Sequence, residues 1–114
     1  MSNTIQTPFI KWGNYKSQDQ NNPDVLELQV AEVDTFETAY STNVRVRLRI
    51  GDDWEERILP LKSYESTNNT LLKEWQKAEN KKLVKVGKKF ILKTWLGKSK
   101  RSDFPMRRFV LEFL

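Results

Sequence analysis

Residues Val44 to Ile50 read Val-Arg-Val-Arg-Leu-Arg-Ile, a strict alternation of apolar and cationic side chains. Successive side chains of a β-strand point to opposite faces of a sheet, so this period of two predicts a strand with one buried face. The other face then carries a row of guanidinium groups, Arg45, Arg47 and Arg49. The sequence therefore predicts a sheet with a cationic surface.

Strand patterns also flank this stretch. Before it, alternation from Val25 changes phase at Val33, which predicts a first strand with a bulge, and Asp34 to Asn43 is expected to form a loop or frayed strand ends. After it, Gly51-Asp52-Asp53 predicts a turn, and Trp54 to Leu61 predicts a third strand.

The sequence indicates where the third strand ends but leaves its register open. Pro60 indicates that the strand ends nearby, because proline cannot donate to a ladder. A two-residue turn would place Arg49 opposite Glu56, and a three-residue loop would place it opposite Glu55. Part of the arginine row is therefore expected to pair with these carboxylates.

One helix is predicted after the third strand. Residues 66–69 offer several N-cap oxygens, and Leu71, Leu72, Trp75 and Ala78 follow at helical spacing. Trp75 lies within this apolar stripe, so we expect it in the core. Alternating patterns then predict strands from Phe90 to Leu96 and from Met106 to Leu114, separated by a basic turn over 97–103.

The first 24 residues are expected to form an arm and linker, and residues 25–114 to form the folded domain. Most of residues 1–24 are polar, but Phe9 to Tyr15 contains large rings that are unfavourable in water. Two interpretations remain open for this segment: it packs on the sheet or covers a sheet edge, or Trp12 or Tyr15 stacks on a ligand base.

Charge and aromatic content favour an anionic partner. The last 48 residues hold thirteen of the twenty Lys and Arg and four of the fifteen Asp and Glu, and the net charge is +5. Four Trp, three Tyr and six Phe accompany these cations. Cations interleaved with flat rings are typical of surfaces that bind phosphates and stack on bases.

Several function classes are poorly supported. The chain has no Cys and no His, which removes the commonest metal ligands and the usual proton shuttle at neutral pH. The carboxylates near residues 52–56 are interpreted as turn chemistry, so no metal, cofactor or catalytic residue is expected. No apolar run approaches the roughly 20 residues of a membrane span, and the N-terminus lacks signal-peptide features, so we expect a soluble, cytoplasmic or nucleoid-associated protein.

The predicted order is strand, strand, strand, helix, strand, strand, over about 90 residues. With Gly87 preceding the alternating fourth strand in Lys85 to Leu92, the chain resembles the OB-fold, an all-β, five-stranded Greek-key barrel with one helix. It resembles in particular the small single-stranded DNA-binding proteins of that fold. The resemblance implies a ligand groove across strands two and three, flanked by the loops over 34–43 and 97–105.

We therefore predict a non-catalytic, largely sequence-independent binder of single-stranded DNA or RNA, with DNA favoured. Replication or repair proteins are further partners that such a role implies. The alternatives are a protein-interaction subunit whose basic face meets an acidic partner, and an architectural protein that binds double strands. The predicted phosphate contacts are Arg45, Arg47, Arg49, Lys98, Lys100 and Arg101. The predicted stacking rings are Phe36, Tyr40, Trp54, Trp12 and Trp95, the last of which equally suits packing by the arm.

Overall fold

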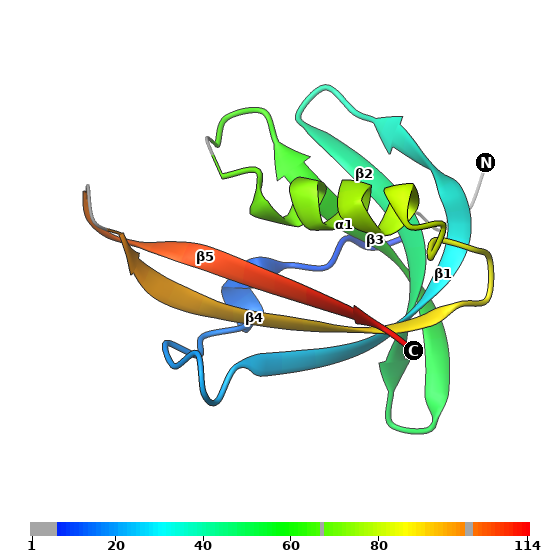
Figure 1. Ribbon diagram of the computed structural model, residues 1–114, viewed down its shortest axis with the longest axis horizontal. Coiled ribbons are helices and arrows are strands. Elements are labelled where there is room, and N and C mark those ends of the chain that lie inside the picture. Colours follow the sequence, from blue (N-terminus) through cyan, green and yellow to red (C-terminus); the bar gives the residue numbers. More distant parts are fainter. Residues whose placement is uncertain (1–6, 67, 100–101) are drawn as a thin grey trace, which may run out of the picture.

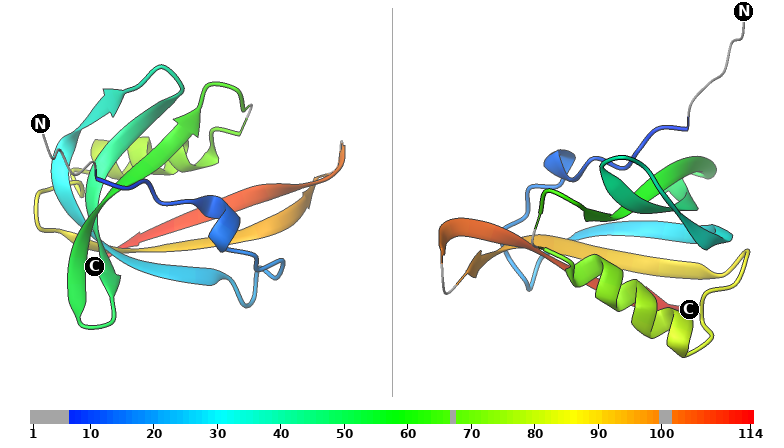
Figure 2. Two further views of the ribbon diagram at one scale, coloured as in Figure 1. Left: turned by 180° about the vertical axis from the view of Figure 1, so that it is seen from behind. Right: turned by 90° about the horizontal axis from the view of Figure 1, so that it is seen from above.

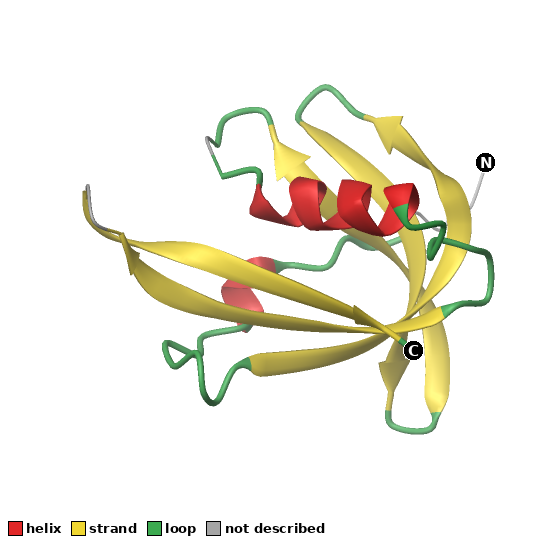
Figure 3. Cartoon of the chain, viewed as in Figure 1, coloured by secondary structure: helices red, strands yellow, loops and turns green. Residues whose placement is uncertain are grey.

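The computed structural model describes residues 7–66, 68–99 and 102–114, and it forms one antiparallel sheet with a single α-helix (Figures 1 and 3). The strand order across the sheet is β3-β2-β1-β4-β5, with β1 at the centre. The elements are the 3-10 turn η1 (Trp12–Asn14), β1 (Asp24–Glu37), β2 (Ser41–Ile50), β3 (Asp53–Ser63), α1 (Thr70–Asn80), β4 (Lys89–Ser99) and β5 (Ser102–Phe113).

The predicted sequence of five strands with one helix after the third is confirmed. The sheet is not closed into a barrel, because no ladder joins its edge strands β3 and β5 among the described residues. The β4–β5 hairpin extends to one side of the molecule, away from the β2–β3 hairpin (Figure 1). The sheet is therefore strongly twisted and open between its two edges.

The strands are longer than the sequence indicated. The segment 34–43 was predicted as a loop or as the frayed ends of two strands, and the second alternative is closer: β1 continues to Glu37 and β2 begins at Ser41, which leaves a turn of three residues. The expected phase change of the first strand is confirmed as a register shift between Val30 and Thr35. The bulge lets β1 bend and pair with β2 on both sides of the shift, so polar residues that resembled a loop belong to the ladder.

The ends of β3, β4 and β5 also required correction. β3 runs past Pro60 to Ser63, since Pro60 lies on an edge strand, next to a register shift, where a missing N–H is tolerated. The predicted basic turn at 97–103 is largely strand, because Ser99 pairs with Ser102.

The hairpin between β2 and β3 has a register that neither sequence alternative contained. Ile50 pairs with Asp53 around the two residues Gly51 and Asp52, and this register places Arg49 opposite Trp54. Gly51 has a φ of 63°, a conformation that glycine adopts without strain at the first position of a two-residue hairpin turn. The turn at Gly51 and Asp52 therefore places Trp54 beside Arg49, at one end of the arginine row.

The core lies between the inner face of the sheet and α1. Trp75 is fully buried, as predicted, with its ring 5.7 Å from that of Phe90 and 6.1 Å from that of Phe113. The helix ends in a Schellman motif, in which Leu83 N–H donates to the Ala78 carbonyl and Lys82 adopts a φ of 60°. No described helix is long and apolar enough to cross a membrane.

Replacing Trp75 with alanine should lower the free energy of unfolding by about 3–5 kcal/mol, because the change leaves a large cavity at the helix–sheet contact. The measurement is equilibrium urea unfolding followed by far-UV circular dichroism. Lys73→Ala, at an exposed position of the same helix, is the matched control and should stay within about 0.5 kcal/mol of the wild-type protein. A Trp75→Ala variant as stable as this control would contradict the assigned core.

Candidate functional site

The predicted arginine row lies on the outer face of the sheet, opposite the core. Directly paired residues share a face, so the register gives one row across four strands that contains Glu56, Arg47, Gln29 and Lys89. The adjacent pair in the β2–β3 ladder is Trp54 and Arg49. Cations from two strands and one indole thus lie on the same face.

The arginines of this row pair mainly with β1, not with Glu55 and Glu56 as the sequence suggested. Arg49 Nη1 lies 2.8 Å from Glu27 Oε2, and Arg45 Nε lies 3.8 Å from Glu32 Oε2. Arg47 Nη1 donates a long hydrogen bond of 3.5 Å to Gln29 Oε1. Exposed ion pairs contribute about 0–1 kcal/mol, so these contacts are weak competitors for a phosphate.

A hollow of about 230 Å³ opens beside the arginine row. Arg45 and Arg47 of β2 and Arg57 of β3 line it together with Glu32 and Glu56. We call this set the arginine hollow. Arg57 pairs with the buried Val46 in the ladder and forms an ion pair with Glu55 at 3.7 Å. Arg45 and Arg47 are therefore the guanidinium groups of this set that the register places on the outer face.

Two predicted stacking rings already contact cations on the sheet. The Lys89 ammonium lies 5.5 Å from the centroid of the Trp54 ring, and the Arg45 guanidinium lies 5.1 Å from the centroid of Phe36. Cation–π contacts at exposed sites are worth about 0.5–1 kcal/mol. Both rings therefore lie beside cations in the structure.

The β4–β5 hairpin carries the other predicted residues away from the arginine hollow. Trp95 pairs with Arg108 across this hairpin, and Lys98 is exposed towards its end. Lys100 and Arg101 lie outside the described residues. The described site residues thus occupy separate regions of the molecule, not the single surface that the resemblance implied.

The N-terminal arm, residues 8–17, connects the two edges of the sheet. Ile10 N–H donates to the Ile58 carbonyl at the free edge of β3, and Ile58 N–H donates to the Pro8 carbonyl. Further along, Arg107 of β5 donates from Nη2 to the carbonyls of Trp12 and Tyr15, at 3.0 and 2.7 Å. The arm lies on the side of the strands opposite α1 (Figure 2).

The arm packs on the protein, which was one of the two interpretations that the sequence left open. Ile10 belongs to the buried core, and the ring of Trp12 meets that of Phe109 edge to face at 4.9 Å. Burial raises the pKa of Tyr15, an effect that nearby Asp24 reinforces. Burial also lowers the pKa of Arg107, but an arginine remains protonated at neutral pH and holds the arm as a cation.

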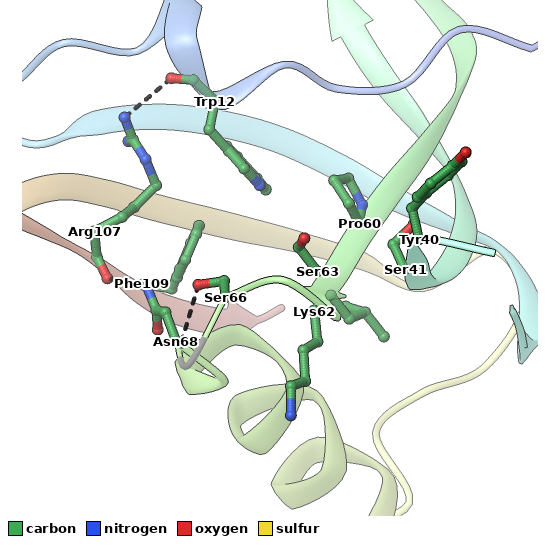
Figure 4. A pocket seen from close by; sticks show the side chains of 11 residues that line it. Trp12, Tyr40, Ser41, Pro60, Lys62, Ser63, Ser66, Asn68, Arg107 and Phe109 are labelled. Carbon is green, nitrogen blue, oxygen red and sulfur yellow. Dashed lines mark hydrogen bonds between the residues drawn. The ribbon is translucent and has the colours of Figure 1, made fainter. Parts of the chain in front are cut away.

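A second hollow, of about 460 Å³, opens where the sheet is not closed. Figure 4 shows Trp12 and Tyr40 on different sides of it, with Pro60 and Ser63 of β3 between them. We call it the arm pocket. Its other apolar walls are Leu61 and Phe109, and its polar lining comes from Lys62, Arg107, Ser41, Ser66 and Asn68.

Sequence reasoning missed three of the cations. Arg57 lacks the alternation that marked the arginine row, Lys89 belonged to a lysine-rich run that resembles a solvated surface, and Arg107 lies in a strand with no sign of a partner. Lys89 and Arg107 acquire their contacts from residues distant in the chain, Trp54 and the arm. Among the described residues, no cluster of His, Cys, Asp or Glu could hold a metal ion.

Comparisons with protein families, with curated proteins and with solved structures found no match to this chain.

Replacing Arg107 with methionine should loosen the arm. The variant loses the hydrogen bonds to Trp12 and Tyr15 and a third to the Thr94 hydroxyl, and hydrogen bonds from charged groups contribute about 1.5–3 kcal/mol. We expect amide hydrogen exchange to accelerate at Ile10 and Ile58. Arg108→Met, at the neighbouring position of β5, is the control, and unchanged exchange at both amides in Arg107→Met would contradict the role of Arg107.

Proposed function

We propose that this protein binds single-stranded nucleic acid without catalysis and largely independently of base sequence, with DNA favoured over RNA. The observation that carries the proposal is the arginine hollow, with Trp54 on the same face of the sheet. Guanidinium groups form charge-assisted hydrogen bonds to phosphate oxygens, and an indole ring stacks on any base. Neither contact requires a particular base sequence.

The strand order supports an OB-type arrangement. Opening a five-stranded OB barrel between its third and fifth strands gives the order β3-β2-β1-β4-β5, with a helix between the third and fourth strands. In this protein the arm bridges the corresponding gap. The face of β2 and β3 that holds the arginine hollow is the face on which such folds bind their ligands.

Phosphate binding at the hollow requires that ligand contacts replace the existing ion pairs. Arg45 and its partner Glu32 are both substantially exposed, so their 3.8 Å pair is screened by water and salt. A phosphate offers each guanidinium two acceptor oxygens and releases counterions on binding. The new interactions are therefore expected to outweigh the weak ion pairs that they replace, and the ligand is expected to bind more tightly at low salt.

The proposal is tested by titrating labelled single-stranded DNA, single-stranded RNA and duplex DNA at two salt concentrations. We expect the single strands to bind more tightly than duplex, to weaken as salt rises and to quench tryptophan emission. Equal or tighter duplex binding would favour an architectural role. No mobility shift and no quenching with single strands at low salt would refute the proposal, and binding of an acidic peptide alone would favour a protein-interaction subunit.

Arg47→Glu should weaken single-strand binding about tenfold, because one charged hydrogen bond is worth about 1.5 kcal/mol or more. The slope of log affinity against log salt should fall by about 0.7 for each phosphate that the variant no longer neutralises. Fluorescence anisotropy at several salt concentrations measures both quantities.

Lys73→Glu makes the same change of charge on the exposed side of α1 and serves as the control. It should change affinity far less than Arg47→Glu does. Equal effects of the two variants on affinity would mean that net charge, and not the arginine hollow, governs binding.

A further inference from the structure

The arm pocket differs chemically from the arginine hollow. Rings and a proline supply its apolar walls, through Trp12, Tyr40, Phe109 and Pro60. Its volume of about 460 Å³ falls within the range of about 300–1,000 Å³ that is usual for small-ligand sites. Such a pocket suits a flat, apolar group larger than a methyl or a single water.

Charge at the arm pocket favours an anionic ligand. Lys62 and Arg107 belong to its lining, and no carboxylate does so within the described part of the chain. The arginine hollow, in contrast, includes Glu32 and Glu56. Because the Arg107 guanidinium already donates to Trp12, Tyr15 and Thr94, a phosphate near the flat group of a ligand would meet Lys62 without displacing an ion pair.

Tyr40 is available to such a ligand. It lies in the short β1–β2 turn and is 73% exposed, although it borders an apolar pocket. Its backbone carbonyl accepts a hydrogen bond from Tyr64 N–H, which helps to fix the turn while the ring stays accessible. Trp12 is fixed on the other side of the pocket by Phe109 and by Arg107.

The arm separates the arm pocket from the arginine hollow along the β2–β3 hairpin. It crosses the edge of β3 at Ile58, with Thr7 lining the hollow before the crossing and Trp12 lining the pocket after it. On β2, Arg45 of the hollow and Ser41 of the pocket are four residues apart, or about 13 Å at the usual rise per residue. Ser41 is buried on the core side of β2 and Arg45 lies on the outer face, so a single strand would reach both by crossing the arm at the edge of β3.

We propose that the arm pocket receives one unstacked base of the bound strand, with Trp12 at one side of the base and Tyr40 at the rim of the pocket, while the arginine hollow binds phosphates of the same strand. This assignment rests on the proposed function and adds to it a defined base site. Bases of an unpaired strand can turn out of the stack and lie on aromatic side chains, which a duplex does not permit without unpairing. The pocket would thus supply the preference for single strands.

The test is the affinity of Tyr40→Ala for a fluorescein-labelled oligothymidylate, measured by anisotropy. We expect affinity to fall by about five- to a hundredfold, the effect of removing one stacking ring. Tyr64→Ala removes an exposed tyrosine outside the pocket lining and should bind within about twofold of wild type. Because the Tyr40 ring is exposed, thermal unfolding of Tyr40→Ala should match that of wild type, which separates ligand contact from folding.

An abasic scan gives a second, independent readout. One abasic site is moved along the oligothymidylate, and we expect a position at which the missing base weakens binding to wild type but has little further effect on Tyr40→Ala. Equal affinity of Tyr40→Ala and wild type, or abasic effects that are the same in both proteins, would overturn the base site and leave the proposed function standing. Failure of wild type to bind the intact strand would refute the proposed function itself.

Discussion

The hydrogen bonds of the N-terminal arm connect the two open edges of the sheet. An edge strand exposes unpaired N–H and C=O groups, and β3 and β5 both present such edges towards the same opening. The arm satisfies Ile58 on β3 and accepts two hydrogen bonds from Arg107 on β5. It therefore closes part of the opening without adding a sixth strand, and it leaves a pocket beside Trp12.

This arrangement gives the β2–β3 hairpin two different surfaces. The middle of the hairpin bears guanidinium groups that alternate with the core residues of β2, so their position follows from the pleat of the strand. At the open end of the hairpin, where β2 begins and β3 ends, the β1–β2 turn and the arm lie nearby. They bring Tyr40 and Trp12 to one pocket. One surface suits phosphates and the other suits a base, which are the two contacts that the proposed binding of an unpaired strand requires.

The sequence was most informative where the pattern within one strand or helix is enough to predict which of its faces is buried. Strict alternation predicted β2 with its arginine face, and helical spacing predicted Trp75 in the core. The register of the β2–β3 hairpin was not predictable. The turn lies at Gly51 and Asp52, so the residue directly opposite Arg49 on β3 is Trp54 and not a glutamate. The contacts of the arm were also inaccessible, since Arg107 and Trp12 are 95 positions apart and neither residue has a local signal for the other.

We propose that an unpaired strand follows the β2–β3 hairpin and passes over the arm. The most direct measurement is the change of backbone amide chemical shifts when the full chain is titrated with a single-stranded oligonucleotide. We expect the largest changes in β2, in the β1–β2 turn at 38–40 and around Trp12, with little change on the exposed side of α1. Largest changes along α1, with β2 and the arm unaffected, would contradict the proposal.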